Sequence, residues 1–198
     1  MVLPSAQLFP NALLPLYIFE PRYRAMLTWS LEHDRMFCIA QMKPGINEAR
    51  TTDEFHHTVG LGLIRASIQG TDGTSELVLL GLARMEITGF LQDAPFRIAE
   101  LRELAPQPAP AAENASLSKR LLEAFAALFA GSKHPQATLA KELQGISDPA
   151  VLSDIIAHTC LRDPEARQAV FEEMKIAKRA ALLLHYLSTE STRPEGRD

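Results

Sequence analysis

The sequence is poor in the residues that catalysis, metal binding or membrane insertion requires. Its 198 residues include only two cysteines, six histidines and one tryptophan. No apolar run approaches the roughly 18 residues that a membrane-spanning helix needs. The N-terminus also lacks a basic segment followed by an apolar run and a small-residue cleavage site, so we expect no secretory signal. These absences predict a cytoplasmic protein with no membrane association.

The two cysteines, Cys38 and Cys160, lie far apart in apolar segments. Such surroundings favour buried, reduced thiols, which fits a reducing compartment. The spacing alone leaves a disulfide between them open, and it does not decide whether either thiol has a redox role.

Familiar catalytic motifs are missing. The sequence contains no G-x-x-x-x-G-K-[ST] phosphate loop and no G-x-S-x-G nucleophile motif. Gly60 and Gly62 have no third glycine to complete a dinucleotide-binding fingerprint, and their surroundings favour a tightly packed strand. His56 and His57 are adjacent, so on a strand they would face opposite sides and could not share a metal ion. We therefore predict no catalytic residue, no metal site and no cofactor.

The charge distribution argues against a nucleic-acid partner. The net charge is −4, and neither half of the chain is basic. Residues 1–105 carry nine Lys and Arg against twelve Asp and Glu, and residues 106–198 carry eleven against twelve. Proteins dedicated to nucleic acids normally concentrate positive charge on one face or one region.

The chain divides at a proline-rich segment, LAPQPAPAAENA, within which residues 106–112 form a predicted semi-rigid linker. Residues 1–105 are predicted to form a β-rich domain and residues 113–190 an α-helical bundle. The polar residues 191–198 are predicted to form a flexible tail.

Before the linker, strand-like apolar segments dominate. We predict strands over residues 35–42, 58–69, 75–90 and 96–104, with the GTDGT sequence as a hairpin turn and a bulge in the last pairing. A helix starts at Pro21. Its predicted apolar stripe consists of Tyr23, Met26, Leu27, Ser30 and Leu31.

After the linker, the apolar spacing becomes helical. Asp148 and Asp163 each precede a proline, an arrangement typical of a helix N-cap followed by the first helical position. The final segment places Ile176, Ala180, Leu183, Leu184 and Leu187 on one predicted stripe.

The segment LFPNALLPLYIFEPRYRAML, residues 8–27, is unusually stiff and apolar. Three prolines restrict its backbone and reduce the entropy of the unfolded chain. Leu14, Leu16 and Ile18 alternate with Pro15, Tyr17 and Phe19, which predicts a strand with one buried face.

These residues resemble the signature of the LON substrate-binding domain, the N-terminal domain of the ATP-dependent Lon protease. The family also occurs in cereblon and in small stand-alone bacterial proteins. The resemblance continues, in the family's order, through DRMFCIAQ, VGLGLIRASI, DGTSELVLLGLARMEI and the helical segment ISDPAVLSDIIAHTCL. It implies an α+β fold with a PUA-like, partly closed β-barrel followed by an α-helical bundle.

Two departures from the family pattern affect what can be expected. Asn11 follows Pro10 where the family commonly has glycine, but asparagine tolerates positive φ best among the other residues, so the turn should survive. Lon's motor and serine–lysine protease domains have no counterpart in this sequence. We therefore expect no protease activity and no enzyme.

The resemblance implies a non-catalytic module that binds unfolded or exposed polypeptide segments. Such segments could add to an exposed strand edge, while surface pockets accept alternate side chains. The candidate contacts are Phe9, Leu13, Tyr17 and Phe19, which the core patterns need least. A separate protease or chaperone could act with such a module.

The remaining signature residues are predicted to hold the helix against the strands. They are Pro15, Glu20, Pro21, Arg22, Tyr23 and Arg24. Glu20 could accept helix N–H groups or pair with an arginine, and a direct role of these charged residues in binding is the alternative.

Three other functions stay open. One is RNA binding, by analogy with other PUA-like folds, although the charge distribution opposes it. A second is a small-molecule pocket between barrel and bundle, with Trp29 as a wall. The third is self-association as a homodimer through an exposed apolar patch.

Overall fold

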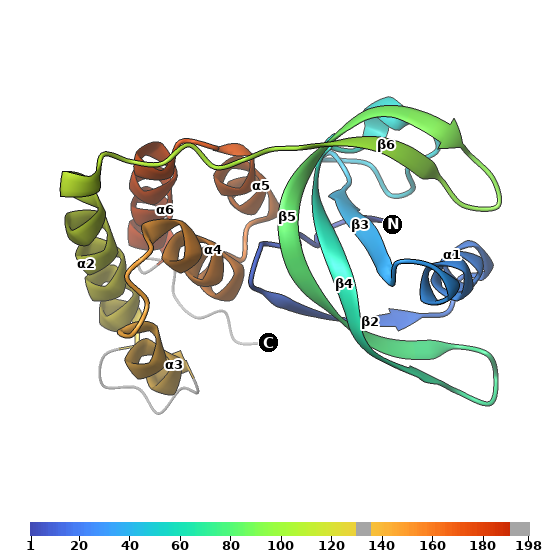
Figure 1. Cartoon of the computed structure of the whole chain (residues 1–198), viewed down its shortest axis with the longest axis horizontal. Coiled ribbons are helices and arrows are strands. Elements are labelled where there is room, and N and C mark those ends of the chain that lie inside the picture. The colour runs from blue at the N-terminus through green and yellow to red at the C-terminus, as the bar shows by residue number, and fades with distance from the viewer. Residues whose placement is uncertain (130–135, 191–198) are drawn as a thin grey trace. The chain divides into compact units, whose positions relative to one another are not determined.

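The computed structural model of the chain describes residues 1–129 and 136–190, so the predicted tail 191–198 lies outside the described residues. Residue contacts divide the chain into two compact units, residues 1–105 and residues 106–198 (Figure 1). Each unit is described by itself.

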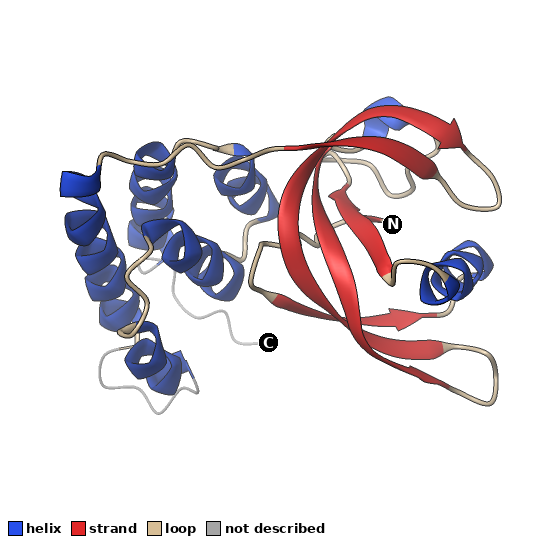
Figure 2. Cartoon of the chain, viewed as in Figure 1, coloured by secondary structure: helices blue, strands red, loops and turns tan. Residues whose placement is uncertain are grey.

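The first unit contains a six-stranded sheet and one α-helix (Figure 2). The strands are β1 (Val2–Leu3), β2 (Leu13–Ile18), β3 (Met36–Gln41), β4 (Thr58–Gln69), β5 (Ser75–Gln92) and β6 (Ile98–Glu103). The helix α1 spans Pro21–Glu32, and a short 3-10 turn η1 spans Thr52–Glu54. The strand order is β1-β3-β4-β5-β2, and β6 pairs with the far part of β5.

The strand predictions for this unit are confirmed with small shifts. The strand β4 has the predicted bounds, whereas β5 extends two residues further, to Gln92, and β6 begins only at Ile98. The predicted bulge is present, because the β5–β6 register shifts twice between Ile87 and Gln92. Thr74 closes the predicted β4–β5 turn by accepting a 2.9 Å hydrogen bond from the N–H of Gly70.

The helix α1 packs on the sheet through the predicted stripe, with one exception. Tyr23, Met26, Leu27 and Ser30 are buried, but Leu31 is 36% exposed, so its predicted burial is wrong. The stripe joins a core cluster that also contains Leu8, Ile18, Phe37, Ile39, Ile64, Leu77 and Leu79. A second cluster contains Ala40, Met42, Ala49, Phe55, Val59 and Ile87.

The segment that precedes β2 crosses closely over the sheet. An added Cβ at Gly60 or Gly81 would overlap the carbonyl oxygen of Leu8 or Phe9, respectively. Close backbone packing at Gly60, predicted from the sequence, is therefore confirmed. Asn11 also has the positive φ expected for it, 63°, and its N–H donates to the carbonyl of Gly81 at 2.9 Å.

The second unit is helical. Its helices are α2 (Ala111–Leu128), α3 (Gln136–Leu143), α4 (Pro149–Cys160), α5 (Pro164–Glu172) and α6 (Ile176–Glu190). The side chain of Asp148 accepts from the N–H of Ala150, and that of Asp163 from the N–H of Glu165, which confirms both predicted N-caps. The sheet of the first unit and these helices make the fold α+β.

The proline-rich segment, predicted as a semi-rigid linker over residues 106–112, makes backbone hydrogen bonds to the helical unit. The N–H of Gln107 donates to Met174 at 2.7 Å, and its carbonyl accepts from Ile176 at 3.0 Å. The helix α2 starts at Ala111, inside the predicted linker. Backbone pairing with residues 174–176 therefore ties this segment to the helical unit.

Cys38 and Cys160 are both half-buried, and neither forms a disulfide. Among the described residues, no helix combines the length and the apolar character needed to cross a bilayer.

Candidate functional site

The outward side of β2, β5 and β4 carries an apolar surface, which we call the outer face. Strand register places its residues in three rows, each crossing the three strands in the order β2, β5, β4. The rows are Leu13–Leu80–Leu63, Pro15–Val78–Ala66 and Tyr17–Glu76–Ile68. Glu76 is the single charged residue in these rows.

The outer face follows from the alternation of side chains along a strand. The intervening residues of β2, Leu14, Leu16 and Ile18, pack in or against the first core cluster. Successive side chains of a strand point to opposite sides of the sheet, so their neighbours point outward. The strand β4 keeps this alignment across a register shift between Ile64 and Ala66.

Large apolar side chains on this face are open to solvent. Leu13 is 56% exposed, Tyr17 54% and Ile68 72%. The ring of Phe19, 59% exposed, stacks on that of Tyr17 with 6.0 Å between centroids and extends the face beyond β2. Soluble proteins expose single apolar residues often, but a contiguous apolar patch marks an interaction surface.

The middle of the outer face is hollowed. A depression of about 470 Å³ lies over the three strands. It is lined by Pro15, Leu16, Tyr17, Ala66, Ile68, Glu76, Leu77 and Val78. The volume is sufficient for more than one apolar side chain of a partner.

The structure brings three of the four predicted contacts together and contradicts the fourth. Leu13 and Tyr17 are exposed on β2, and Phe19 is exposed just after its end. Phe9 is wrong as a contact, because its side chain has 0% exposure. It is buried where the preceding segment crosses Gly81, and the guanidinium of Arg84 lies 5.8 Å from its ring centroid.

The edge of β2 is interrupted by Pro15. The strand β2 stands at one end of the sheet order. The N–H of Gly81 donates to the carbonyl of Ala12, and in an antiparallel pair alternate residues direct their backbone groups to the partner strand. Leu13, Pro15 and Tyr17 therefore direct theirs to the outer edge, where proline supplies no N–H.

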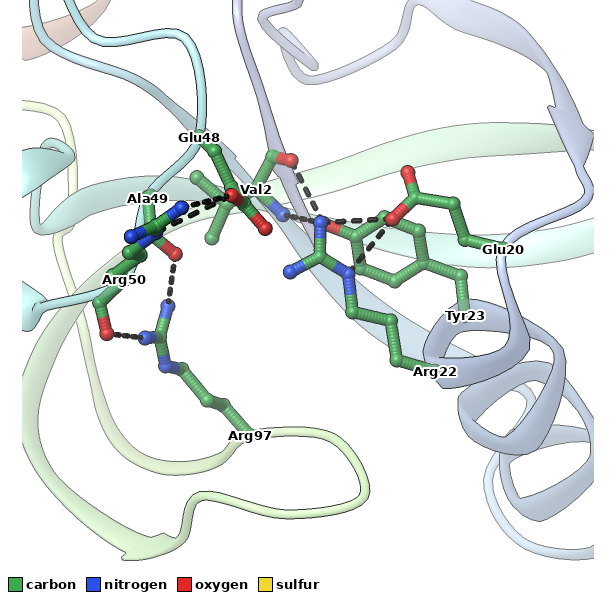
Figure 3. Close-up of polar contacts among 8 residues, drawn as sticks. All are labelled: Val2, Glu20, Arg22, Tyr23, Glu48, Ala49, Arg50 and Arg97. Carbon is green, nitrogen blue, oxygen red and sulfur yellow. Dashed lines mark hydrogen bonds and ion pairs between the residues drawn. The ribbon is translucent and has the colours of Figure 1, made fainter.

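The signature residues around α1 make structural contacts (Figure 3). Glu20 does not cap the helix with its side chain; it accepts from Arg22 at 2.8–2.9 Å. The hydroxyl of Tyr23 donates to the carbonyl of Val2 at 2.9 Å. Arg24 lies against the backbone of Gly73 in the β4–β5 turn. These contacts join α1 to β1 and to the β4–β5 hairpin.

Two ionisable groups, the phenol of Tyr23 and the amino group of Met1, have shifted pKa values. Burial raises the pKa of the Tyr23 phenol. Burial also lowers the pKa of the Met1 amino group to about 6; a weaker interaction with Cys38 opposes this shift, and the nearby charges of Arg97 and Arg22 add to it. The amino group donates to the carbonyl of Cys38 at 2.7 Å, which holds β1 along β3.

Comparison with known proteins decides the family. The family model described as the ATP-dependent protease La (LON) substrate-binding domain matches residues 1–189. The chain belongs to this LON family. Similar proteins include Lon protease 1 of Hydrogenovibrio crunogenus, 22% identical over 190 residues, and Lon protease 1 of Myxococcus xanthus, 25% identical over 188 residues. The alignments cover 96% and 92% of this chain and 23% of each relative.

Solved structures of the LON family share the fold. The N-terminal domain of a Mycobacterium avium complex Lon protease superposes with a TM-score of 0.75 at 16% identity, covering 95% of this chain and 96% of the other. A Lon N-terminal domain protein from Xanthomonas campestris superposes with a TM-score of 0.66 at 17% identity, covering 93% and 96%.

The matched part of the Lon proteases is the substrate-binding region. The chain spans about a quarter of the length of these curated relatives, and their ATPase and protease regions lie outside the match. Within the described residues, no group of three or more His, Cys, Asp or Glu side chains gathers as a metal site would require.

The contacts predicted from the LON signature lie only in and beside β2. Ile68, Val78 and Ala66 were missed, although the hairpin turn between β4 and β5 could have located them. Counting back from that turn pairs Ile68 with Glu76, but only the register of β2 against β5 places both beside Tyr17. The missing signal was the register of β2 against β5, which no local pattern predicts.

Proposed function

We propose that this chain is a non-catalytic module of the LON type that binds apolar segments of unfolded or exposed polypeptides on the outer face. The observation that carries the proposal is the set of three strand rows with one charge, on which Leu13 and Tyr17 are exposed and which Phe19 extends. The family match to a substrate-binding domain supports the same kind of partner.

Binding would depend on side chains more than on added strand pairing. A polypeptide that extends the sheet needs successive N–H and C=O groups along its edge. Pro15 removes the central donor of the β2 edge, and prolines at edges oppose strand addition. Apolar side chains of the client would instead enter the hollow over Pro15, Val78 and Ala66. We therefore expect a client polypeptide to pair with the edge of β2 over a short stretch at most.

The proposal covers binding only, because the chain matches only the substrate-binding region of the Lon proteases. Catalytic activity is not part of it; a separate protease or chaperone would process the bound client. The PUA-like, partly closed barrel and the division into a β-rich domain, linker and bundle also remain part of this proposal.

Fluorescence anisotropy of a labelled, permanently unfolded polypeptide tests the proposal directly. We expect saturable binding by the wild-type protein. Tyr17→Ser and Phe19→Ser should each weaken it about tenfold or more, because aromatic side chains supply most of the contact area in such surfaces. Leu91→Ser is the matched control, since Leu91 is 69% exposed on β5 but lies outside the outer face. Circular dichroism establishes that each variant is folded.

A labelled RNA oligonucleotide is titrated in parallel. Salt-sensitive binding to RNA alone would contradict the proposal and support the PUA analogy. Equal loss of polypeptide binding in Leu91→Ser and Tyr17→Ser would also overturn it, because the outer face would then have no special role. Sedimentation velocity over a concentration series measures whether copies of the chain pair through the same face.

A further inference from the structure

The first unit contains a second apolar space, separate from the outer face. It is a cavity of about 390 Å³ within residues 1–105. Five aromatic side chains contribute to its wall, Trp29, Phe37, Phe55, Phe90 and Phe96. Protein interiors are normally packed with few voids larger than a water molecule, and small-ligand pockets start at about 300 Å³. The cavity therefore has the size and lining of a ligand site.

The cavity lies where the sheet is left open. On one side are Cys38 and Ala40 of β3, and on the other are Ile98, Ala99 and Leu101 of β6. The strand β6 pairs with β5, and β3 pairs with β4 and β1. The strands β3 and β6 are not paired with each other across this space, and apolar side chains bound it.

The cavity follows one side of α1. Met26, Trp29 and Ser30 line it, and residues three and four apart share a helix face. Arg22 lies one turn earlier on the same face. Arg22 and Arg97 line an adjoining cavity of about 110 Å³ that shares Met26, Phe96 and Arg97 with the large one. The two arginines therefore lie at one end of the large cavity, and Asp93 also lines the adjoining one.

Arg97 is fixed in place at that end. It donates to the carbonyl of Arg50 at 2.6 Å and to that of Ala49 at 3.5 Å (Figure 3). It also pairs with Asp93 at 2.9 Å. The side chains of Arg97 and Asp93 are 21% and 80% exposed, so water weakens this ion pair. Arg22 pairs with Glu20, which is also partly exposed.

The only acidic residue in the wall of the large cavity is Asp34, which lies beyond the opposite end of α1. A helix of twelve residues is about 18 Å long, so Asp34 and Arg22 are separated by the length of the helix.

From this arrangement we infer that the cavity binds an amphiphilic carboxylate, with its apolar chain along α1 and its carboxylate at Arg22 and Arg97. The apolar length, the two arginines at one end and Asp34 at the opposite end distinguish this ligand from a neutral or cationic one. The inference does not depend on the outer face, because the two sites share no residue of their walls.

Decanoate, decanol and decylamine are the probes, each kept below its aggregation concentration and titrated into the full chain. Trp29 is the only tryptophan and lies in the cavity wall, so intrinsic fluorescence reports occupancy. We expect a saturable blue shift with decanoate, at an affinity about tenfold or more above that of decylamine.

Two variants test the apolar part and the arginine end of the cavity separately. Ala99→Phe fills the apolar part and should abolish the decanoate response, whereas Ala112→Phe, on exposed α2, should leave it unchanged. Arg22→Gln should weaken decanoate about tenfold while leaving decanol unaffected. Thermal unfolding establishes that each variant is folded.

A measurement on the unmodified chain avoids any dependence on variants. The thiol of Cys38 lines the cavity, so decanoate should slow its alkylation by iodoacetamide at pH 9, detected by peptide mass spectrometry. Two results would overturn the inference: no saturable shift and no protection with decanoate, or equal affinity for decanoate and decylamine.

Discussion

At the scale of single residues, Gly81 shows how backbone proximity constrains the sequence. A Cβ at this position would overlap the carbonyl oxygen of Phe9, which is backbone and cannot rotate away. We predict that Gly81→Ala lowers the free energy of unfolding by about 1–3 kcal/mol. Urea denaturation measures this. Gly145→Ala is the control, because its Cβ would meet its nearest neighbour at an ordinary 3.6 Å. Equal effects of the two substitutions would contradict the steric explanation.

Cys38 predicts a pH dependence of stability. Burial raises the pKa of its thiol from 9.0 to about 11. The folded chain therefore favours the protonated thiol, so this contribution is complete below about pH 9 and is lost as the pH rises toward 11. Between pH 8 and 10 the wild type should lose about 1 kcal/mol more stability than Cys38→Ala. Denaturation curves at both pH values test this, and parallel losses in the two proteins would exclude it.

At the scale of elements, α4 and α6 are joined by a buried ion pair. Nη1 of Arg179 lies 3.2 Å from Oδ1 of Asp154, and the two side chains are 0% and 5% exposed. Nε of Arg179 also donates to the carbonyl of Glu173 at 2.7 Å. Removing one member of such a pair leaves a buried charge without its partner.

We predict that Arg179→Ala lowers the free energy of unfolding by about 3–5 kcal/mol. The double variant Asp154→Leu with Arg179→Met should recover most of this loss, because it removes both charges and keeps the volume. Lys119→Ala, which removes an exposed i,i+4 pair on α2, should have no measurable effect. Thermal unfolding distinguishes the three variants. A double variant as unstable as Arg179→Ala would show that packing around Arg179, rather than charge, is decisive.

The elements also show which structural features local sequence patterns can predict. The bounds of β4, the N-caps Asp148 and Asp163 and the buried face of β2 could be predicted, because each depends on a few neighbouring residues. The burial of Arg179 could not be predicted, because a charged residue at the border of an apolar run is expected to be exposed. Phe9 was misplaced for the same reason: its burial depends on contact with Gly81, 72 positions later in the chain.

The candidate site was predicted only along β2. Leu13, Tyr17 and Phe19 emerged from the alternation of one strand. The residues of β4 and β5 beside them required the sheet register, which depends on long-range pairing. The cavity along α1 has no sequence signal of its own, because its walls come from seven separate segments of the first unit.

At the scale of the whole molecule, the net charge of −4 and the apolar outer face predict weak dependence of polypeptide binding on salt. Between about 50 and 200 mM salt, a protein with several phosphate contacts loses about 10³–10⁵ in affinity for nucleic acid. We expect the affinity for an uncharged unfolded polypeptide to change less than about twofold over that range. Anisotropy at four salt concentrations measures it, and a steep decrease would point to charge-driven binding.

Pro15 also affects how the chain behaves at high concentration. A sheet edge beside an exposed apolar surface is the usual starting point for fibril growth, because each arriving copy continues the ladder of the last. Here the ladder would fail at its centre, where Pro15 offers no N–H to the next strand. Pro15 lines the hollow of the outer face and also opposes fibril growth by strand addition at the β2 edge. We therefore expect the chain to expose this apolar surface without forming fibrils.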